Sequence, residues 1–344
     1  MPAKLPVGII GLGRMGQVYA RQLAAMPEVD IAIVSDVLAD HAQTFAAEIE
    51  AKSWSTDYHD VLDHPDVRAV FIISPTNTHA QILVDGAASG KALFCEKPIA
   101  LTVAETDRAI QAAEQHGAMV QAGFMRRFDP AYAAAKQQIE DGVIGTPTTF
   151  KAIGRDPFCP PLHFAPRAVS GGLILDMGIH DFDLARWLMN TEVHRVYTEG
   201  GTLAFPELND VGDIDNAVVN LRFENGTIGN VEVSRNAVYG YDIRTEILGT
   251  EGGINIGQYR KTALVTLTRQ GATHDLIPYL HDRFIPAYIN QTRDFVTRVI
   301  NNQPPAINLY DARASLIVGL AATRSFDEAR PVELSEFPPL PNAG

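Results

Sequence analysis

A strand that runs into three spaced glycines and then into a helix is the feature that most constrains this chain. Residues 7–10 form a short apolar strand, and Gly11, Gly13 and Gly16 complete a GxGxxG before an expected helix over 14–26. In this pattern the first glycine permits a tight turn, the second lets the backbone approach a pyrophosphate, and the third lets the helix pack on the sheet. The helix N-terminus then offers free N–H groups to phosphate. The segment therefore predicts a dinucleotide-binding domain.

A carboxylate at the end of the second strand predicts which dinucleotide is bound. Residues 31–34 read as that strand, and Asp36 follows 20 residues after Gly16. A carboxylate at this place accepts hydrogen bonds from the adenine ribose and repels a 2′-phosphate, and the following Val37 and Leu38 supply no arginine. The alternative is a solvated acid at a strand end. The motif context favours NAD over NADP.

The rest of the first third alternates strands with helices, which predicts a doubly wound parallel sheet. The expected strands are 67–73, 92–95 and 119–122, and the expected helices are 79–89 and 102–116. We therefore expect a Rossmann domain over residues 1–122.

The pattern changes near residue 123 to longer strands with period-2 alternation, after a helix at about 130–141. The expected strands are 217–223, 227–235, 241–248 and 262–268. This predicts an α/β second domain, residues 123–335, with a large open and mainly antiparallel sheet. The final helix, 311–328, is a candidate to pack back on the first domain.

Charge and composition exclude several classes of partner. The 344 residues carry a net charge of −13, with 46% apolar residues. An acidic chain is a poor ligand for nucleic acid or anionic membranes. No apolar run reaches the ~18 residues that span a bilayer, and the N-terminus has no signal-peptide pattern. Cys95 and Cys159 lie far apart and form no CxxC pair, so we expect neither a disulfide framework nor a thiolate metal site, and a cytoplasmic location.

Two loops that follow the carboxyl ends of strands carry polar side chains. Ligands of parallel sheets bind at these ends of the strands. In the first, Thr76, Asn77 and His79 can hydrogen-bond phosphate or ribose, or the loop is a helix start capped by Asn77 or Thr78. In the second, Lys97 is a charged donor that can polarise a hydroxyl or ketone oxygen. Read alone, a Lys-Pro pair is more often a surface turn, and Pro98 is a candidate cis residue.

Residues 171–188, GGLILDMGIHDFDLARWL, contain a second chemical segment. Asp176, His180 and Asp183 stand at i, i+4 and i+7 and share one helical face. A histidine flanked by carboxylates suits general acid–base catalysis near neutral pH. The alternatives are a capped helix with a polar stripe and a metal site of two acids and a histidine.

Together these segments resemble the glucose–fructose oxidoreductase/inositol dehydrogenase superfamily, and most closely its inositol 2-dehydrogenases. The resemblance covers nearly the whole chain. Its motifs are GLGRMG, PTNTHA, CEKP, GFMRRFD, GRDP, the 171–188 segment, and the C-terminal DAR and RPVEL.

The resemblance implies a homotetramer built through the second-domain sheet, and it implies residue roles. Lys97 would meet the reacting oxygen, His180 would be the general base, and Asp176 would position it. The substrate-binding residues would be Arg127, Asp183, Tyr239 (or Tyr241 if the strand alignment slips) and His163. The cofactor-binding residues would be Gly11, Gly13, Arg14, Met15, Gly16, Asp36, Ser74, Pro75, Thr76, Asn77, His79, Glu96 and Lys97. No metal is expected.

The expected activity is oxidation of a ring hydroxyl of myo- or scyllo-inositol to the ketone, with NAD as the acceptor. The loop Phe158–Phe164 has no clear counterpart in the resemblance and bears on substrate choice. Two alternatives are an NAD-dependent dehydrogenase of a hexose or hexuronate and a non-catalytic NAD-binding regulator. The absent signal peptide and Asp36 disfavour a periplasmic NADP enzyme.

Overall fold

The computed structural model describes residues 4–340, which form two compact units. The first unit comprises the chain up to Met125 together with Tyr288–Arg313, and the second comprises Arg126–Ala287 and Ala314–Pro339. This division differs from the expected one because residues 288–313, which fall in the expected second domain, cluster with the first unit.

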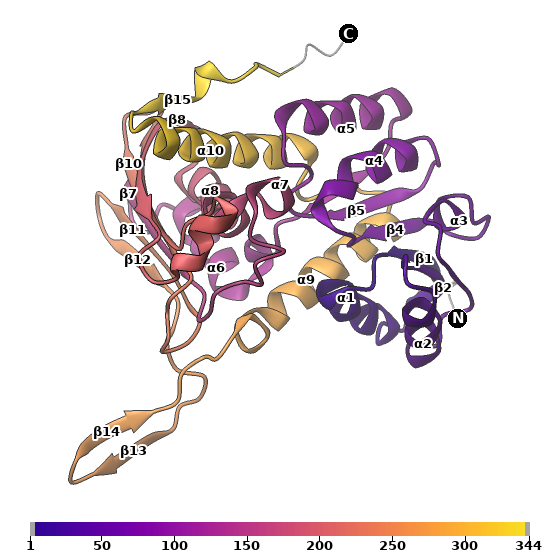
Figure 1. Ribbon diagram of the computed structural model, residues 1–344, viewed down its shortest axis with the longest axis horizontal. Helices are drawn as coiled ribbons and strands as arrows, with labels where there is room; N and C mark the ends of the chain where they lie inside the picture. Colours follow the sequence, from indigo (N-terminus) through magenta and orange to yellow (C-terminus); the bar gives the residue numbers. More distant parts are fainter. Residues whose placement is uncertain (1–3, 341–344) are drawn as a thin grey trace. The chain divides into compact units, whose positions relative to one another are not determined.

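The first unit is built on a six-stranded parallel sheet with the order β3-β2-β1-β4-β5-β6 (Figure 1). Its strands are β1 (Leu5–Ile10), β2 (Val29–Ser35), β3 (Trp54–Ser55), β4 (Ala69–Ile72), β5 (Ala92–Glu96) and β6 (Val120–Gly123). Its helices are α1 (Arg14–Ala24), α2 (Ala39–Glu48), α3 (His59–Leu62), α4 (Thr76–Ala87) and α5 (Val103–His116). The strand order reverses between β1 and β4, and the loops after these two strands meet there, as in Rossmann folds. The predicted doubly wound sheet is confirmed.

The second unit is built on a seven-stranded mixed sheet with the order β12-β11-β7-β10-β9-β8-β15. Its strands are β7 (Pro147–Arg155), β8 (Val193–Gly201), β9 (Asn216–Phe223), β10 (Ile228–Ser234), β11 (Asp242–Gly249), β12 (Gly253–Ile256) and β15 (Val332–Glu333). All neighbours pair antiparallel except β7 and β10. Burial alternates along β9, as its period-2 pattern predicts. The mainly antiparallel sheet is confirmed.

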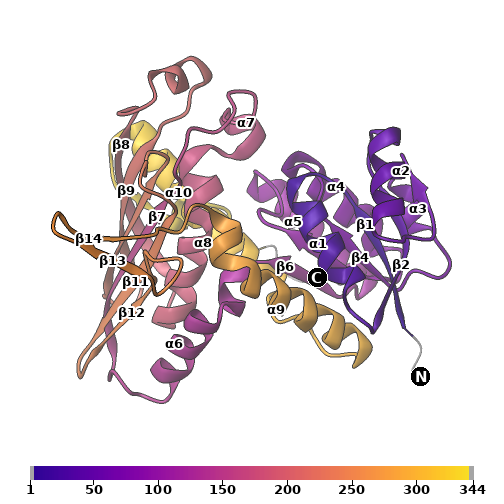
Figure 2. The same ribbon diagram turned by 90° about the horizontal axis from the view of Figure 1, so that it is seen from below.

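One long helix lies along this sheet and positions the second chemical segment. Helix α8 (Gly172–Met189) packs on β7 and β10 (Figure 2). The other short elements of the second unit are α6 (Pro130–Glu140), α7 (Arg167–Ser170), and the 3-10 turns η1 (Met125–Phe128), η2 (Pro206–Val211) and η3 (Leu334–Glu336).

Two helices pass from one unit to the other along the chain. Helix α10 (Leu309–Glu328) matches the expected final helix, whereas α9 (Leu280–Ile300) was not predicted from the sequence. Pro286 lies inside α9, and proline usually marks the end of a helix. A small separate hairpin, β13 (Val265–Thr268) with β14 (Gly271–His274), precedes α9. No helix among residues 4–340 is long and apolar enough to cross a membrane.

Candidate functional site

The three glycines of the first turn have three different structural reasons. Gly11 adopts φ +92°, and a Cβ there would lie 2.6 Å from the backbone of Ser74 after β4. A Cβ on Gly16 would lie 2.0 Å from the Gly11 carbonyl oxygen, so only glycine lets α1 start so close to β1. A Cβ on Gly13 would meet no atom within 4 Å. Packing within the protein therefore does not require a glycine at position 13. The open side of Gly13 is where a pyrophosphate approaches in such turns.

Two helix N-termini next to this turn lack side-chain caps. Gly13 is the N-cap of α1 and Pro75 that of α4, and neither helix has an acidic residue in its first turn. The alternative of a cap by Asn77 or Thr78 is wrong, because α4 already begins at Thr76 and the Thr78 hydroxyl donates to the Pro75 carbonyl at 2.7 Å. Uncapped N–H groups with the positive end of the helix dipole suit an anionic ligand. Arg14 and Met15 form the first turn of α1, beside this anion-binding end.

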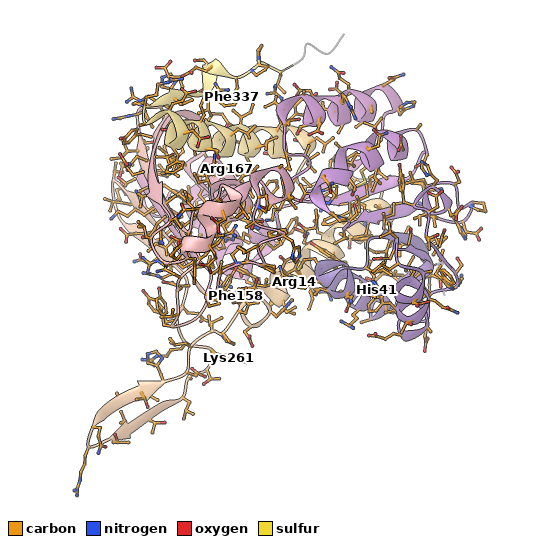
Figure 3. All side chains as sticks on the ribbon, viewed as in Figure 1. Arg14, His41, Phe158, Arg167, Lys261 and Phe337 are labelled. Atoms are coloured by element: carbon orange, nitrogen blue, oxygen red, sulfur yellow. The ribbon has the colours of Figure 1, made fainter. Side chains whose placement is uncertain are left out.

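Asp36 directly follows β2, and its carboxylate is held in place by the backbone. Its Oδ2 accepts from the Leu12 N–H at 2.9 Å and its Oδ1 from the Leu38 N–H at 3.1 Å. His41 Nδ1 lies 3.5 Å from Oδ2, and His41 Nε2 lies 3.2 Å from Gln17 Nε2 (Figure 3 labels His41). Sequence reasoning missed His41 because it missed α2. The carboxylate is thus pre-oriented at the edge of the glycine turn.

Glu96 and Lys97 lie at the carboxyl end of β5, and their side chains differ in accessibility. Glu96 is buried and accepts a hydrogen bond from the Tyr19 hydroxyl at 2.6 Å, while Gln291 Nε2 donates to the same hydroxyl at 2.8 Å. Burial raises the pKa of Glu96. Its Oε2 accepts from the Lys97 N–H at 2.9 Å. Glu96 therefore fixes the turn that presents the half-buried Lys97, and the Lys97–Pro98 bond is cis.

His79 takes a structural place that differs from the direct cofactor contact expected of it. The side chain is 1% exposed, and burial lowers its pKa. Its Nδ1 lies 2.8 Å from the Pro98 carbonyl oxygen and its Nε2 lies 2.8 Å from the Ser74 carbonyl oxygen. Both ring nitrogens therefore face backbone carbonyl oxygens, and the nitrogen that carries the proton donates to its carbonyl, so His79 links the loop after β4 and the turn that carries Lys97.

The start of α8 depends on two glycines and a distant aspartate. Gly171 and Gly172 adopt φ +88° and +73°, a region that favours glycine. The Leu173 N–H donates to Asp213 Oδ1 at 2.9 Å, and a Cβ on Gly172 would approach that oxygen to 2.7 Å. The GG pair and Asp213 together fix where the helix begins, and so which side chains share a face.

Asp176 and His180 lie one turn apart on α8, beside a buried cation. The side chain of Asp176 is 26% exposed and His180 is 9% exposed. Nη2 of the buried Arg235 lies 3.5 Å from Asp176 Oδ2 and 3.7 Å from Asp213 Oδ2. Sequence reasoning missed Arg235 and Asp213, which lie outside every quoted motif. The guanidinium lies within reach of both carboxylates and restrains their orientation.

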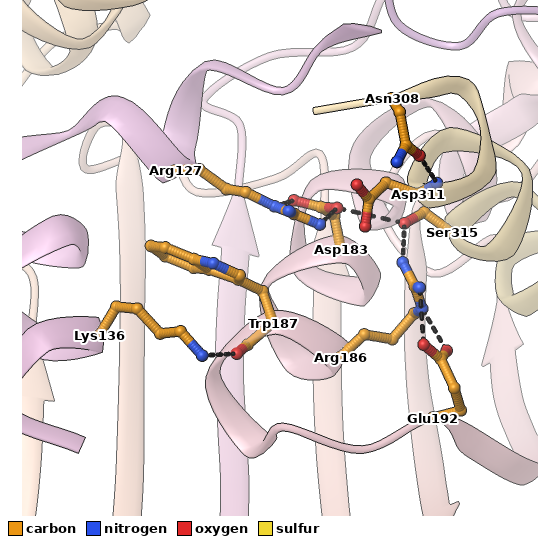
Figure 4. Close-up of polar contacts among 9 residues, drawn as sticks. All are labelled: Arg127, Lys136, Asp183, Arg186, Trp187, Glu192, Asn308, Asp311 and Ser315. Carbon is orange, nitrogen blue, oxygen red and sulfur yellow. Dashed lines mark hydrogen bonds and ion pairs between the residues drawn. The ribbon is translucent and has the colours of Figure 1, made fainter. Parts of the chain in front are cut away.

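Arg127 and Asp183, both expected to bind substrate hydroxyls, are joined to each other (Figure 4). Arg127 Nε donates to Asp183 Oδ2 at 2.8 Å, and Nη2 donates to Oδ1 at 2.6 Å. The Ser315 hydroxyl lies 3.4 Å from Oδ1. Asp183 is 1% exposed. In this arrangement Asp183 orients the guanidinium of Arg127, and the contact of either residue with a substrate hydroxyl stays a prediction.

A second buried ion pair lies beside the first, and the sequence did not reveal it. Arg126 Nη1 donates to Asp181 Oδ1 at 2.5 Å, and both side chains are buried. Burial raises the pKa of Asp181, and Arg126 opposes that rise. The pair joins the turn η1 to the middle of α8. In the part of the chain that the structure describes, no three His, Cys, Asp or Glu side chains come together in a way that holds a metal.

Tyr239 lies in the turn between β10 and β11, where its hydroxyl contacts Arg155 and Asp242, and its role in substrate binding stays a prediction. Gly154 faces α8, since a Cβ there would lie 3.0 Å from Asp181 Oδ2. Neighbouring residues of a strand point to opposite faces, so Arg155 faces away from α8. Arg155 Nη1 donates to the Tyr239 hydroxyl at 2.9 Å, and that hydroxyl donates to Asp242 at 2.7 Å.

Tyr241 is the alternative to Tyr239, and it is buried. Its ring packs against Tyr279 and Phe284, and its charged neighbours include Arg126 and Asp156. Burial raises its pKa. Tyr241 thus lies among the charged side chains near α8. His163 is an exposed residue of the loop that follows β7.

Two family models and many individual proteins match the chain. Residues 5–124 match "Oxidoreductase family, NAD-binding Rossmann fold", and residues 132–255 match "GFO/IDH/MocA C-terminal domain". The chain is 39% identical to scyllo-inositol 2-dehydrogenase (NAD(+)) of Bacillus subtilis over 97% of both chains. It is 37% identical to myo-inositol 2-dehydrogenase of Thermotoga maritima over 96% of this chain and 98% of that one.

A solved structure extends the likeness to three dimensions. The structure of scyllo-inositol dehydrogenase from Lactobacillus casei, with bound NAD(H) and scyllo-inositol, matches with a TM-score of 0.92 at 31% identity. The match covers 96% of this chain and 99% of that chain.

Proposed function

Because the chain belongs to the GFO/IDH/MocA oxidoreductase family, we propose that it oxidises a ring hydroxyl of scyllo- or myo-inositol to the ketone, with NAD as hydride acceptor. The observation that carries the proposal is the joint presence of the open glycine turn and the Asp176–His180 face of α8 in a chain that aligns from end to end with inositol dehydrogenases.

The residues of the first unit fit NAD. The open side of Gly13 and the uncapped start of α1 suit the pyrophosphate, and the oriented carboxylate of Asp36 suits the hydroxyls of the adenine ribose. The same carboxylate repels a 2′-phosphate, which favours NAD over NADP. When bound, NAD supplies a carbon that accepts a hydride.

The chain's own residues handle the proton and the developing charge. Oxidation of a secondary alcohol releases a hydride and a proton, and the pKa of the alcohol is far above cellular pH. The imidazole of His180 takes the proton from the hydroxyl as general base. The ammonium of Lys97 stabilises the negative charge that grows on the same oxygen. Asp176 positions the imidazole and stabilises its cationic form.

Arg235 and Arg127 complete the proposed site as positioning and binding groups. Arg235, set between Asp176 and Asp213, holds the Asp176 carboxylate in orientation. Arg127, aligned by Asp183, offers its guanidinium to a neighbouring hydroxyl of the ring.

A specific loop favours one second candidate, an NAD-dependent dehydrogenase of a hexose or hexuronate. Phe158, Leu162 and Phe164 are all more than a third exposed, in the segment that has no counterpart in the family motifs. Exposed apolar side chains beside a polyol site change which ring substituents fit. A screen of NAD reduction with inositols, hexoses and hexuronates separates the two candidates.

The proposed assembly is a homotetramer in the cytoplasm. The seven-stranded sheet leaves a broad face opposite α8, and closed symmetric oligomers are the usual way to cover such a face. Neither Cys95 nor Cys159 forms a disulfide, which is usual for proteins of reducing compartments.

The test is turnover with NAD affinity recorded separately. His180→Ala and Lys97→Ala should each lower kcat by roughly two to four orders of magnitude while NAD binding persists. If His180→Ala binds NAD normally and keeps nearly full turnover across the pH range, the proton acceptor lies elsewhere. Activity on hexoses with none on inositols would move the substrate to the second candidate.

A further inference from the structure

The hairpin of β13 and β14 projects from the second unit as an arm (Figure 1). Its two four-residue strands pair with each other and with no other strand among residues 4–340. None of the residues from 261 to 274 is buried. A lone two-stranded hairpin is at most marginally stable in water, so an arm of this kind needs an outside surface to pack on.

The base of the arm is fixed, so the arm extends in a defined direction. Thr262 donates to Asp275 twice, from its N–H at 3.1 Å and from its hydroxyl at 2.6 Å. Lys261, labelled in Figure 3, forms an ion pair with Asp282 at 2.5 Å. The Ile277 N–H donates to the Tyr259 carbonyl at 3.0 Å. These bonds orient the arm before any partner is met.

The two faces of the arm differ in chemistry. Val265 pairs with His274 and Leu267 pairs with Ala272, so one face carries Val265, Leu267 and Ala272, with His274 at its end next to Val265. Leu267 is 78% exposed. The other face carries threonines at 266, 268 and 273. An ordered ribbon with one exposed apolar face is typical of an interaction surface.

The charge of the arm favours a second copy of this chain as the partner. Residues 258–277 hold three cations, Arg260, Lys261 and Arg269, and one acid, Asp275, which gives a net charge of +2. The whole chain has a net charge of −13, so the remainder carries −15. A basic arm on an acidic molecule is attracted to another copy of that molecule.

We propose that residues 261–274 are a clasp that lays its Val265–Leu267–Ala272 face on a second copy of this chain. The proposal rests on the proposed homo-oligomer and adds the arm to the sheet face as an element that stabilises it. The threonine face stays toward solvent, and the cations at the base and tip steer the arm to the acidic partner.

The test is a matched pair of double variants followed by sedimentation velocity over roughly 1–50 µM protein. Val265→Ser/Leu267→Ser removes the apolar face, and Thr266→Ser/Thr273→Ser changes the opposite face of the same hairpin. The first should raise the subunit dissociation constant at least about tenfold, and the second should leave it unchanged. Salt at roughly 0.5 M should weaken the wild-type assembly in the same direction.

The outcomes separate this proposal from those on which it rests. An assembly that keeps its mass and concentration dependence in Val265→Ser/Leu267→Ser overturns the clasp and leaves the oligomer standing. A monomeric wild type overturns both. Binding of the wild type, but not of that variant, to phosphatidylserine vesicles would make the arm a lipid-binding element and overturn the choice of partner. Mass is the readout, so the result is independent of the proposed activity.

Discussion

The carboxylate of Asp176 lies next to the guanidinium of Arg235, which is buried and 59 residues further along the chain. If Arg235 acts through Asp176, then Arg235→Gln should lower kcat about tenfold or more in the wild-type background. In an Asp176→Asn background the same change should cost less than about twofold, because the group on which it acts is gone. Arg235→Lys should restore part of the activity. The measurement is kcat for the four members of the cycle, with the KM for NAD recorded for each.

A purely structural role for Arg235 gives a different pattern. In that case Arg235→Gln lowers kcat by the same factor in the wild-type and the Asp176→Asn backgrounds. The decrease in activity then follows the fraction of protein that is folded. Arg313→Gln is the matched control, since Arg313 is also a buried arginine paired with a carboxylate, Asp107, at 2.5 Å. It should lower thermal stability and leave kcat per folded molecule near that of wild type.

Glu96 makes stability depend on pH. Burial raises its pKa above the ordinary 4.5, so in the window above pH 4.5 the folded chain holds a proton that the unfolded chain has released. The free energy of unfolding contributed by this group therefore falls as the pH rises through that window. Glu96→Gln keeps an acceptor for Tyr19 but cannot ionise. Its stability relative to wild type should increase from pH 4 to pH 8 in urea unfolding.

An exposed carboxyl of the same unit is the control for Glu96. Glu48 on α2 pairs with Arg21 at the surface, and Glu48→Gln should shift stability little. If the difference between Glu96→Gln and wild type is the same at every pH, the buried carboxyl does not titrate in the way its surroundings predict.

At the scale of elements, two glycines of the turn between β1 and α1 have different roles, one in stability and one in NAD binding. Gly16→Ala places a Cβ against the Gly11 carbonyl and should lower the free energy of unfolding by about 1–3 kcal/mol. Gly13→Ala places a Cβ in open space at φ −63° and should leave stability within about 0.5 kcal/mol of wild type. It should nevertheless weaken NAD binding at least about tenfold, because the methyl occupies the pyrophosphate side.

Calorimetry and NAD titration of the two variants check this contrast. Gly13→Ala with wild-type NAD affinity would show that the open side does not meet the cofactor. Gly16→Ala with unchanged stability would show that α1 can move away from β1 without cost.

At the scale of the whole molecule, the activity should not need a metal. Of the three polar residues that share a face of α8, Asp183 has both carboxylate oxygens bonded to Arg127 and Asp176 faces Arg235, so the set does not form a cation site. Dialysis against EDTA should leave kcat unchanged. Loss of activity on chelation, restored by zinc or manganese, would return the α8 carboxylates to the role of ligands.

The sequence by itself determined the parts of this protein that depend on neighbours along the chain. The GxGxxG turn, Asp36 and the continuous apolar strands predicted the first unit, because turn geometry and strand burial leave a local pattern. The i, i+4, i+7 spacing on residues 172–189 predicted the polar face of α8 for the same reason. Helix α9 was missed because Pro286 obscures the local signal.

The tertiary structure alone decided what surrounds those residues. Arg235 reaches Asp176 from the end of β10, Arg127 closes on Asp183, and His79 lies against the Pro98 carbonyl oxygen. Such contacts join segments about 20 to 60 residues apart, and no local pattern of residue types encodes them.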